Sequence, residues 1–169
     1  MNLENITHGI KINSITVDGR GNLWMGTDGA GLIKLENGRF EQITNGLPSL
    51  KISQILVDIH DKLWYLTTSG QLGWAKNTFC HTIQMDFPST VVICAIALAR
   101  DGDLWIATSH DENLGSRIFE LHGIAAREPT RTYPWPQDLS RSRIGALLED
   151  SSGSLWCGTL GAGVFLLRP

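Results

Sequence analysis

The sequence predicts an all-β protein built from four copies of one four-stranded antiparallel unit, and three observations support this prediction. Four similar segments begin at Ile12, Ile52, Ile93 and Ile144, and each contains a Leu-Trp pair. The tryptophans of these pairs lie 40, 41 and 51 residues apart, a period typical of proteins with one supersecondary unit per repeat. Short runs of Ile, Leu, Val and Trp are separated by Gly, Asp, Asn and Ser without helical periodicity, which indicates strands joined by tight turns.

The first copy shows the unit most clearly. Its strands are expected at residues 12–17, 23–27, 32–35 and 40–43, and the turns between them read "DGRGN", "DGAG" and "ENGR". Glycine and asparagine suit such turns because they adopt positive φ at little cost. A radial array of these sheets is a β-propeller, so we predict four blades at about 12–44, 52–84, 93–133 and 144–169.

The two ends of the chain complement each other in this scheme. The segment "LENITHGI" from Leu3 to Ile10 aligns with "FEQITNGL" from Phe40 to Leu47, whereas the last copy stops after three strands. An N-terminal strand at residues 3–7 is therefore able to complete the last blade and close the ring within one propeller domain, 1–169. Two alternatives stay open: the strand pairs with a second chain to form a homo-oligomer, or the chain is a fragment of a larger propeller.

Composition excludes several classes of protein. The chain has 169 residues, enough for one domain, and its net charge of -3 argues against a nucleic-acid partner. No run approaches the roughly 18 apolar residues of a membrane span, and the N-terminus lacks the features of a signal peptide. The cysteines, Cys80, Cys94 and Cys157, have no metal-ligand or disulfide-framework spacing, so we expect buried free thiols.

The stretch "GNLWMGTDGAGL" at residues 21–32 resembles a glycine-rich phosphate loop, but it recurs as "GSLWCGTLGAGV" at residues 153–164. It also lacks the Lys and following helix of such a loop, so its glycines are interpreted as turn residues. The repeated tryptophans are expected to pack between blades, since a large aromatic buries much apolar area. These structural inter-blade residues are Trp24, Trp64, Trp105 and Trp156.

With these motifs in view, the repeats resemble the two-component regulator propeller family, whose unit is similar to "I..I..D..GNLWMGT..GGL" followed by "GLP". Here the connection is "NGLPSLKISQI", from Asn45 to Ile55, whereas the second copy departs with "HDK" and "LTTSG" and the third carries an insertion. The resemblance implies a periplasmic sensor region of a bacterial signalling protein, commonly attached to a histidine kinase or diguanylate cyclase. The signalling output domain would then lie outside this chain.

One set of candidate ligand-binding residues precedes the first strand of each copy. Lys11, Lys51 and Arg143 occupy this position in three copies and Val92 in the fourth. The first strand lines the axis of a propeller, so the positive charges would gather near one mouth of the channel and favour an anionic ligand, such as a sugar acid or sulfate. The alternative is that these side chains merely flank strand ends in solvent.

The insertion "SHDENLGSR" in the third copy supplies further candidates. His110, Asp111 and Glu112 would emerge on the same propeller face as the basic residues, together with Trp135, which lies between two prolines. Added loop length on one face is often functional, and a small-molecule or oligosaccharide-like ligand is the expected partner. A surface insertion without function is the alternative.

No catalytic, cofactor or metal site is predicted. The five histidines are dispersed over different strand and loop types, and no Ser-His-Asp or Cys-His arrangement follows from the spacing. The leading interpretation is a non-catalytic sensing module. A lyase or lactonase type of enzyme is one alternative and would need residues such as His8, His110, Asp111 and Glu112 to converge on a divalent metal. A protein-protein assembly scaffold is the other.

Overall fold

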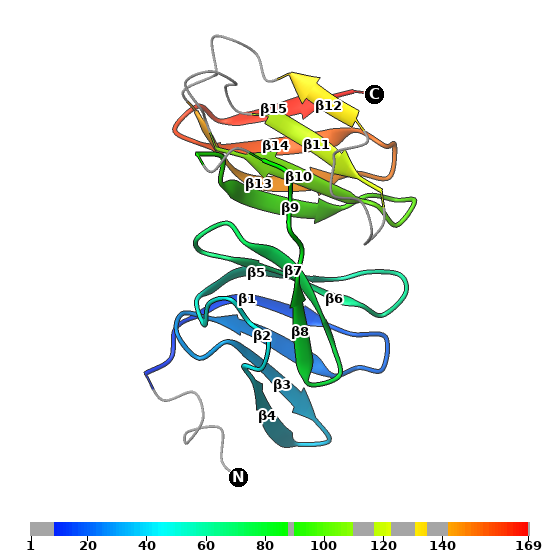
Figure 1. The fold of residues 1–169 in the computed structure, drawn as a ribbon. Coiled ribbons are helices and arrows are strands. Elements are labelled where there is room, and N and C mark those ends of the chain that lie inside the picture. The colour runs from blue at the N-terminus through cyan, green and yellow to red at the C-terminus, as the bar shows by residue number, and fades with distance from the viewer. Residues whose placement is uncertain (1–8, 88–89, 110–116, 123–130, 135–141, 169) are drawn as a thin grey trace. The chain divides into compact units, whose positions relative to one another are not determined.

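The computed structural model describes residues 9–87, 90–109, 117–122, 131–134 and 142–168, and over this part of the chain it contains 15 strands and no helix (Figure 1). Within those ranges, no helix is long and apolar enough to cross a membrane.

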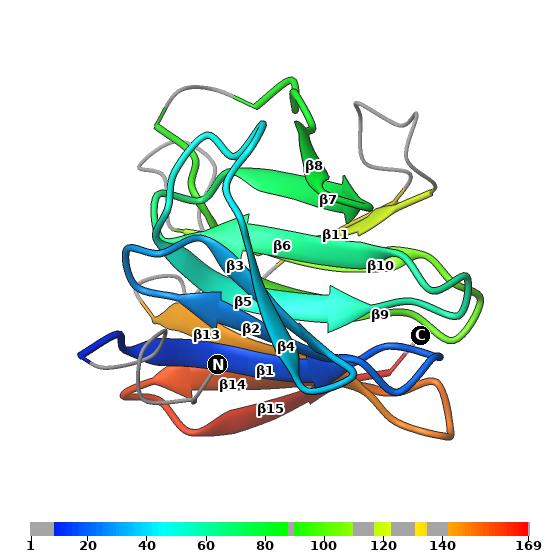
Figure 2. The ribbon, with the colours of Figure 1, turned by 90° about the horizontal axis from the view of Figure 1, so that it is seen from below.

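The strands form four antiparallel sheets, which we call blades 1 to 4, and in each the strands are hydrogen-bonded in sequence order. Blade 1 contains β1 (Ile12–Val17), β2 (Leu23–Thr27), β3 (Leu32–Glu36) and β4 (Arg39–Ile43). Blade 2 contains β5 (Ile52–Val57), β6 (Leu63–Thr67), β7 (Leu72–Lys76) and β8 (Phe79–Thr82), which lie side by side in Figure 2. Blade 3 contains β9 (Ile93–Leu98), β10 (Leu104–Thr108), β11 (Arg117–Leu121) and β12 (Arg131–Pro134). Blade 4 contains β13 (Arg143–Glu149), β14 (Leu155–Leu160) and β15 (Val164–Leu167).

The prediction of an all-β fold made of antiparallel propeller blades is confirmed. In blade 1, β1 and β2 have the expected bounds, β3 ends one residue later and β4 begins one residue earlier. The β3–β4 turn shows why: Asn37 and Gly38 have φ values of 49° and 74°, so two residues suffice to reverse the chain. Blade 4 has three described strands, and the expected strand at residues 3–7 lies outside the described residues and stays a prediction.

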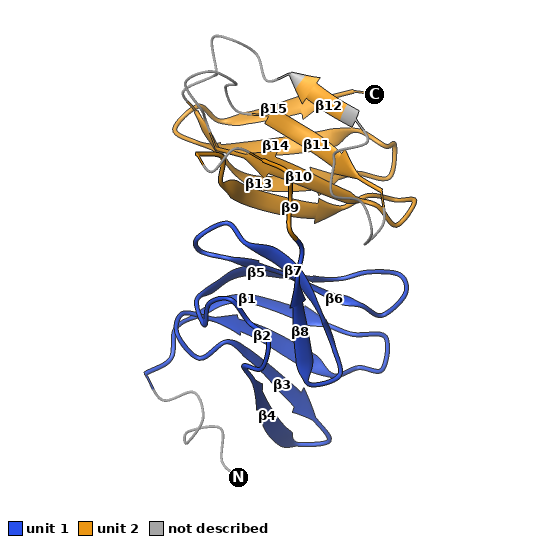
Figure 3. Cartoon of the chain, viewed as in Figure 1, with its two compact units in different colours: residues 1–83 blue, residues 84–169 orange. Residues whose placement is uncertain are grey.

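The chain divides into two compact units, Met1–Ile83 with blades 1 and 2, and Gln84–Pro169 with blades 3 and 4 (Figure 3). Within each unit the two blades meet through their first strands, β1 with β5 and β9 with β13. Each unit therefore has its own core between two sheets.

In the core of the first unit, isoleucines of blade 2 pack against a glycine of blade 1. Trp24 and Leu32 pack in one buried cluster with Ile52 and Ile55. A Cβ added to Gly26 would lie 2.8 Å from Ile52 Cγ2 and 3.2 Å from Ile55 Cγ2, so only glycine fits there without a shift. This close approach brings the two sheets within the packing distance that buries their apolar faces.

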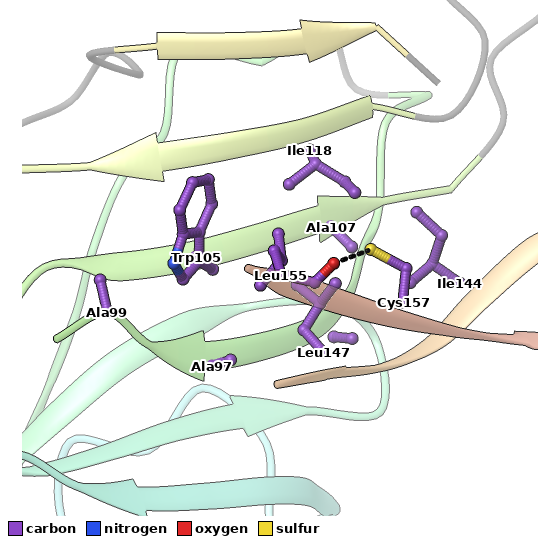
Figure 4. Close-up of a cluster of buried hydrophobic side chains, with 10 residues drawn as sticks. Ala97, Ala99, Trp105, Ala107, Ile118, Ile144, Leu147, Leu155 and Cys157 are labelled. Carbon is purple, nitrogen blue, oxygen red and sulfur yellow. Dashed lines mark hydrogen bonds between the residues drawn. The ribbon is translucent and has the colours of Figure 1, made fainter. Parts of the chain in front are cut away.

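The core of the second unit uses alanines for the same purpose (Figure 4). Blade 3 presents a face of small residues, and the larger Ile144, Leu147 and Leu155 of blade 4 pack against it. The small residues of blade 3 in this cluster are Ala95, Ala97, Ala99 and Ala107. Cys157 completes the cluster as a fully buried thiol, with Sγ 3.9 Å from the carbonyl oxygen of Leu155.

The repeated tryptophans have a second role besides packing. The indole Nε1 of Trp24 donates to Asp18 Oδ2 at 2.9 Å, and that of Trp64 donates to Asp58 Oδ2 at 2.9 Å. The carboxylate stands six residues before the tryptophan, and its other oxygen accepts backbone N–H groups of the same turn. Each of these carboxylates thus satisfies a largely buried indole N–H and closes the turn before β2 or β6.

Blades 3 and 4 depart from this pattern in different ways. In blade 3, Ala99 stands at the carboxylate position, and Trp105 Nε1 donates instead to Glu149 Oε2 of blade 4 at 2.6 Å. In blade 4, Trp156 keeps its own acceptor, Asp150, at 2.8 Å. Trp156 is nevertheless 41% exposed, whereas Trp24, Trp64 and Trp105 are buried. The expected inter-blade packing of Trp156 is therefore not formed among the described residues.

Candidate functional site

Each first strand carries a β-bulge near its start. Ile12 pairs with Thr27 while Ser14 pairs with Gly26, so Asn13 is the extra residue between them. The same irregularity recurs in the other blades, at Ser53, Cys94 and Gly145. Bulges bend a strand and redirect side chains, and they are common next to functional sites. Sequence reasoning missed this feature, although the extra residue shifts the alternation by one and the recurrent Ile-x-x-Ile spacing, as at Ile12 and Ile15, was its signal.

The residues that precede the first strands, Lys11, Lys51, Val92 and Arg143, occupy one equivalent position in the four blades, which we call the basic column. The carbonyl of Lys11 accepts the N–H of Asp28 at 2.9 Å, and the carbonyl of Lys51 accepts that of Thr68 at 2.9 Å. Val92 accepts from Ser109 at 2.7 Å in the same way, and Arg143 pairs with Leu160. The side chains of Lys11, Lys51 and Arg143 are all exposed. Equivalent backbone pairing thus sets this position in each blade, two residues before the bulge residue.

Within the first unit the structure brings Lys11 and Lys51 next to the same residue, Asp28. Asp28 donates its N–H to Lys11 and forms an isolated antiparallel bridge with Lys51. The N–H groups of Gly29 and Gly31 both donate to the carbonyl of Leu50, which holds the "DGAG" turn against the start of β5. The backbones of Lys11, Lys51 and Asp28 therefore lie side by side at this end of blades 1 and 2, and all three residues are exposed. Sequence reasoning missed Asp28, because its place beside both lysines depends on contact between two copies.

In the second unit Arg143 lies beside the bulge residue of blade 3. Burial raises the pKa of the Cys94 thiol to about 11, while the charge of Arg143 and a hydrogen bond from it act in the opposite direction. Cys94 is half-buried and donates to the carbonyl of Ala107 at 3.3 Å. The thiol is therefore protonated at neutral pH.

The other predicted ligand residues lie outside the described residues. These are His110, Asp111 and Glu112 of the insertion, and Trp135. His8, which the lyase alternative would use with the insertion, is outside them as well. Their contribution to a site stays a prediction.

Sequence reasoning did not find a carboxylate cluster on blade 3. One oxygen each of Asp101, Asp103 and Glu120 lies within 4.8 Å of the others, and the imidazole of His122 is hydrogen-bonded to Asp103. Oxygen ligands of this kind suit a divalent cation, but the bond to His122 already takes one oxygen of Asp103. Glu120 comes into reach because it pairs with Trp105 across the sheet, which spacing along the chain does not show.

A small cleft lies between the two blades of the second unit. Its lining residues are Trp105, Tyr133, Gly153, Leu155, Leu167 and Arg168. The accessible volume of about 10 Å³ is at the lower limit for one ordered water, so the cleft is too small for a metabolite.

Solved structures with this fold include extracellular domains of two-component systems and an enzyme. The extracellular domains of two hybrid two-component systems from B. thetaiotaomicron match with TM-scores of 0.72 and 0.74 at 19% and 26% identity, over 94% and 100% of this chain. The chain spans 21% and 22% of those two structures, about a fifth of their length. An inactive virginiamycin B lyase from Staphylococcus aureus matches with a TM-score of 0.70 at 16% identity, over 100% of this chain and 58% of the lyase. At such identity the lyase shares the fold alone.

Sequence comparison agrees with the repeat pattern. No curated protein matches the sequence significantly. The model of the family described as "Two component regulator propeller" matches residues 7–29, 86–110 and 138–161, which fall on the first, third and fourth copies. Three of the four copies therefore match the repeat of the two-component regulator propeller family.

Proposed function

We propose that this chain is a non-catalytic ligand-sensing module of a bacterial signal-transduction protein, and that it binds an anionic ligand at the start of the first strands. One observation carries the proposal: equivalent backbone pairing with the end of the second strand, or with the residue after it, places an exposed cation at the same position of three blades, at Lys11, Lys51 and Arg143. The signalling assignment rests on the family match and on the extracellular domains of two-component systems that share the fold. A periplasmic location and an output domain outside this chain are part of the proposal.

The mixed charge beside Asp28 favours a particular class of anion. Lys11 and Lys51 offer ammonium donors to a carboxylate or sulfate, whereas the Asp28 carboxylate accepts hydrogen bonds and repels a second negative charge. A sugar acid has one anionic group and several hydroxyl donors, so it satisfies all three side chains. Inorganic sulfate satisfies only the lysines. We therefore propose a sugar acid as the ligand class.

Titration with glucuronate and with sulfate at constant ionic strength tests the site. Isothermal titration calorimetry is expected to show binding of glucuronate to the wild type. Lys11→Gln and Lys51→Gln should each weaken it by up to about five-fold, as removal of one exposed ion pair does. Asp28→Ala separates the two ligand classes: it removes the acceptor of the sugar hydroxyls and should weaken glucuronate binding, whereas for sulfate it removes only a repulsion and should strengthen binding.

The matched control is Lys76→Gln, which removes the same charge from an exposed residue at the end of β7, away from the column. Glucuronate affinity should be unchanged in this variant. Equal weakening by Lys76→Gln would mean that only net charge matters, and the proposed site would be wrong. Unaltered affinity in Lys11→Gln and Lys51→Gln would have the same meaning.

A further inference from the structure

Two apolar faces of the chain are exposed, one on blade 1 and one on blade 4. On blade 1 the exposed residues belong to β1: Ile12, Ile15 and Val17. On blade 4 they belong to all three strands: Leu148, Trp156, Val164 and Leu166. Each face points away from the other blade of its own unit, because the alternate residues of the same strands fill the unit's core. Grouped exposure of this kind marks an interaction surface more often than scattered single residues do.

The two faces are the repeat equivalents of the two surfaces that pack in the first unit. There, Trp24, Gly26 and Leu32 of blade 1 receive Ile52 and Ile55 of blade 2. The equivalents on blade 4 are Trp156, Gly158 and Val164, which pair across β14 and β15 as Trp24, Gly26 and Leu32 do across β2 and β3. The equivalents of Ile52 and Ile55 are Ile12 and Ile15 of β1. Blade 4 thus presents the receiving surface, and blade 1 presents the inserting surface.

Gly158 supports the assignment of a receiving surface to blade 4. Gly26 must be glycine, because a Cβ there would lie 2.8 Å from Ile52 Cγ2. Gly158 has no such neighbour among the described residues: its Cβ would meet only Ala146 of the same sheet, at 3.5 Å and 3.9 Å. Its φ is not in the positive range either, so the backbone does not require glycine. The surface over Gly158, beside Trp156, therefore has room for an isoleucine side chain, and we call this space the seat.

We propose that blade 4 of one molecule docks on blade 1 of a second copy of this chain. Ile12 and Ile15 of the second copy enter the seat over Gly158, and the exposed ring of Trp156 is covered as Trp24 is covered in the first unit. The contact joins two different surfaces, so the association is head-to-tail. Burial of the apolar residues on both faces drives it.

Light scattering after gel filtration over a dilution series tests the proposal on the full chain. The wild type is expected to exceed the mass of one chain at high concentration and to fall toward it on dilution. Gly158→Val fills the seat, and Ile15→Asp places a charge on the inserting face, where Ile15 is 59% exposed in the single chain. Each variant should raise the dissociation constant at least ten-fold. Ile59→Asp is the matched control, since Ile59 is 72% exposed in a turn of blade 2, and it should associate as the wild type does.

Mixing the two variants distinguishes head-to-tail docking from other contacts. Ile15→Asp keeps an intact blade 4 face and Gly158→Val keeps an intact blade 1 face, so an equimolar mixture should form particles of two chains that neither variant forms alone. Circular dichroism of each variant confirms that its strands are folded. The proposal is wrong if the wild type stays monomeric, if Ile59→Asp dissociates as Ile15→Asp does, or if the mixture contains only single chains.

Discussion

Asp58→Ala removes the acceptor of a buried indole and tests the role of the carboxylate before each tryptophan. Asp58 Oδ2 accepts the Trp64 Nε1–H at 2.9 Å, and Oδ1 accepts the backbone N–H groups of His60 and Lys62 at 2.9 Å and 3.0 Å. Trp64 is 3% exposed and Asp58 is 7% exposed. Water therefore has little access to the indole N–H once the carboxylate is gone.

The expected cost follows from this burial. An unsatisfied buried donor costs about 1 to 3 kcal/mol. The two backbone N–H groups of the turn can form hydrogen bonds with water instead, so their loss adds little to this cost. We expect the free energy of unfolding to fall by about 2 kcal/mol, and the melting temperature to fall by about 4 to 8 °C in a chain of this size. Asp150→Ala removes the equivalent bonds in blade 4 and one more from Ser152 Oγ, but Trp156 is exposed to solvent, so the loss of stability should be clearly smaller.

Urea unfolding followed by circular dichroism measures both variants. Asp58→Asn keeps an acceptor oxygen and should recover part of the loss. A double-mutant cycle with Trp64→Phe, which removes the donor as well, should show a coupling of about 1 kcal/mol or more. If Asp58→Ala costs no more than Asp150→Ala, burial of the indole N–H does not determine the strength of this interaction, and the reasoning is refuted.

Three further predictions concern the packing of the blades and the thiols. Glu149→Ala should lower the free energy of unfolding by about 1 to 3 kcal/mol, because Trp105 loses its acceptor, and Glu149→Gln should cost less in the same urea experiment. Gly26→Ala should destabilise the chain by about 1 to 3 kcal/mol, since its Cβ meets Ile52 at 2.8 Å, whereas Gly158→Ala should leave the urea midpoint nearly unchanged. Burial raises the pKa of two thiols to about 11 and of the third to about 12, above the ordinary value of 9.0; they are Cys80, Cys94 and Cys157. The folded state holds these protons more tightly, so their contribution to stability is complete below about pH 9 and is lost as the pH rises toward 11. The urea midpoint should therefore fall from pH 8 to pH 9 and pH 10, and a midpoint that rises over this range would contradict the prediction.

The strands could be predicted from the sequence because their signals are local. In blade 1, the turns "DGRGN" and "ENGR" mark the strand ends through residues that adopt positive φ, and the bounds of β1 and β2 follow directly. The partner of Trp105 could not be predicted in this way. Ala99 removes the local acceptor, and the replacement is 44 residues away on the next blade. A pattern read along one copy carries no information on which residue of the adjacent sheet comes within 2.6 Å.

The candidate site was predictable to the same extent. Lys11, Lys51 and Arg143 could be aligned because they precede the same strand in each copy. The proximity of Asp28 to both lysines could not, since it arises where the turn of one blade meets the start of the next. Glu120 is a similar case, because cross-strand pairing brings it to the cluster with Asp101 and Asp103.

The hydrogen bond from Trp105 to Glu149 also determines the order in which the blades can fold during synthesis. Blades 1 and 2 each carry the carboxylate that their own tryptophan requires, so each can complete its first turn as soon as it leaves the ribosome. Blade 3 has Ala99 at that position, so the indole N–H of Trp105 has its acceptor only after Glu149, 44 residues later in the chain, has been synthesised. Since domains form in the order of synthesis, blades 3 and 4 should fold as one cooperative pair, and a nascent chain that ends before Glu149 carries an unfinished third blade.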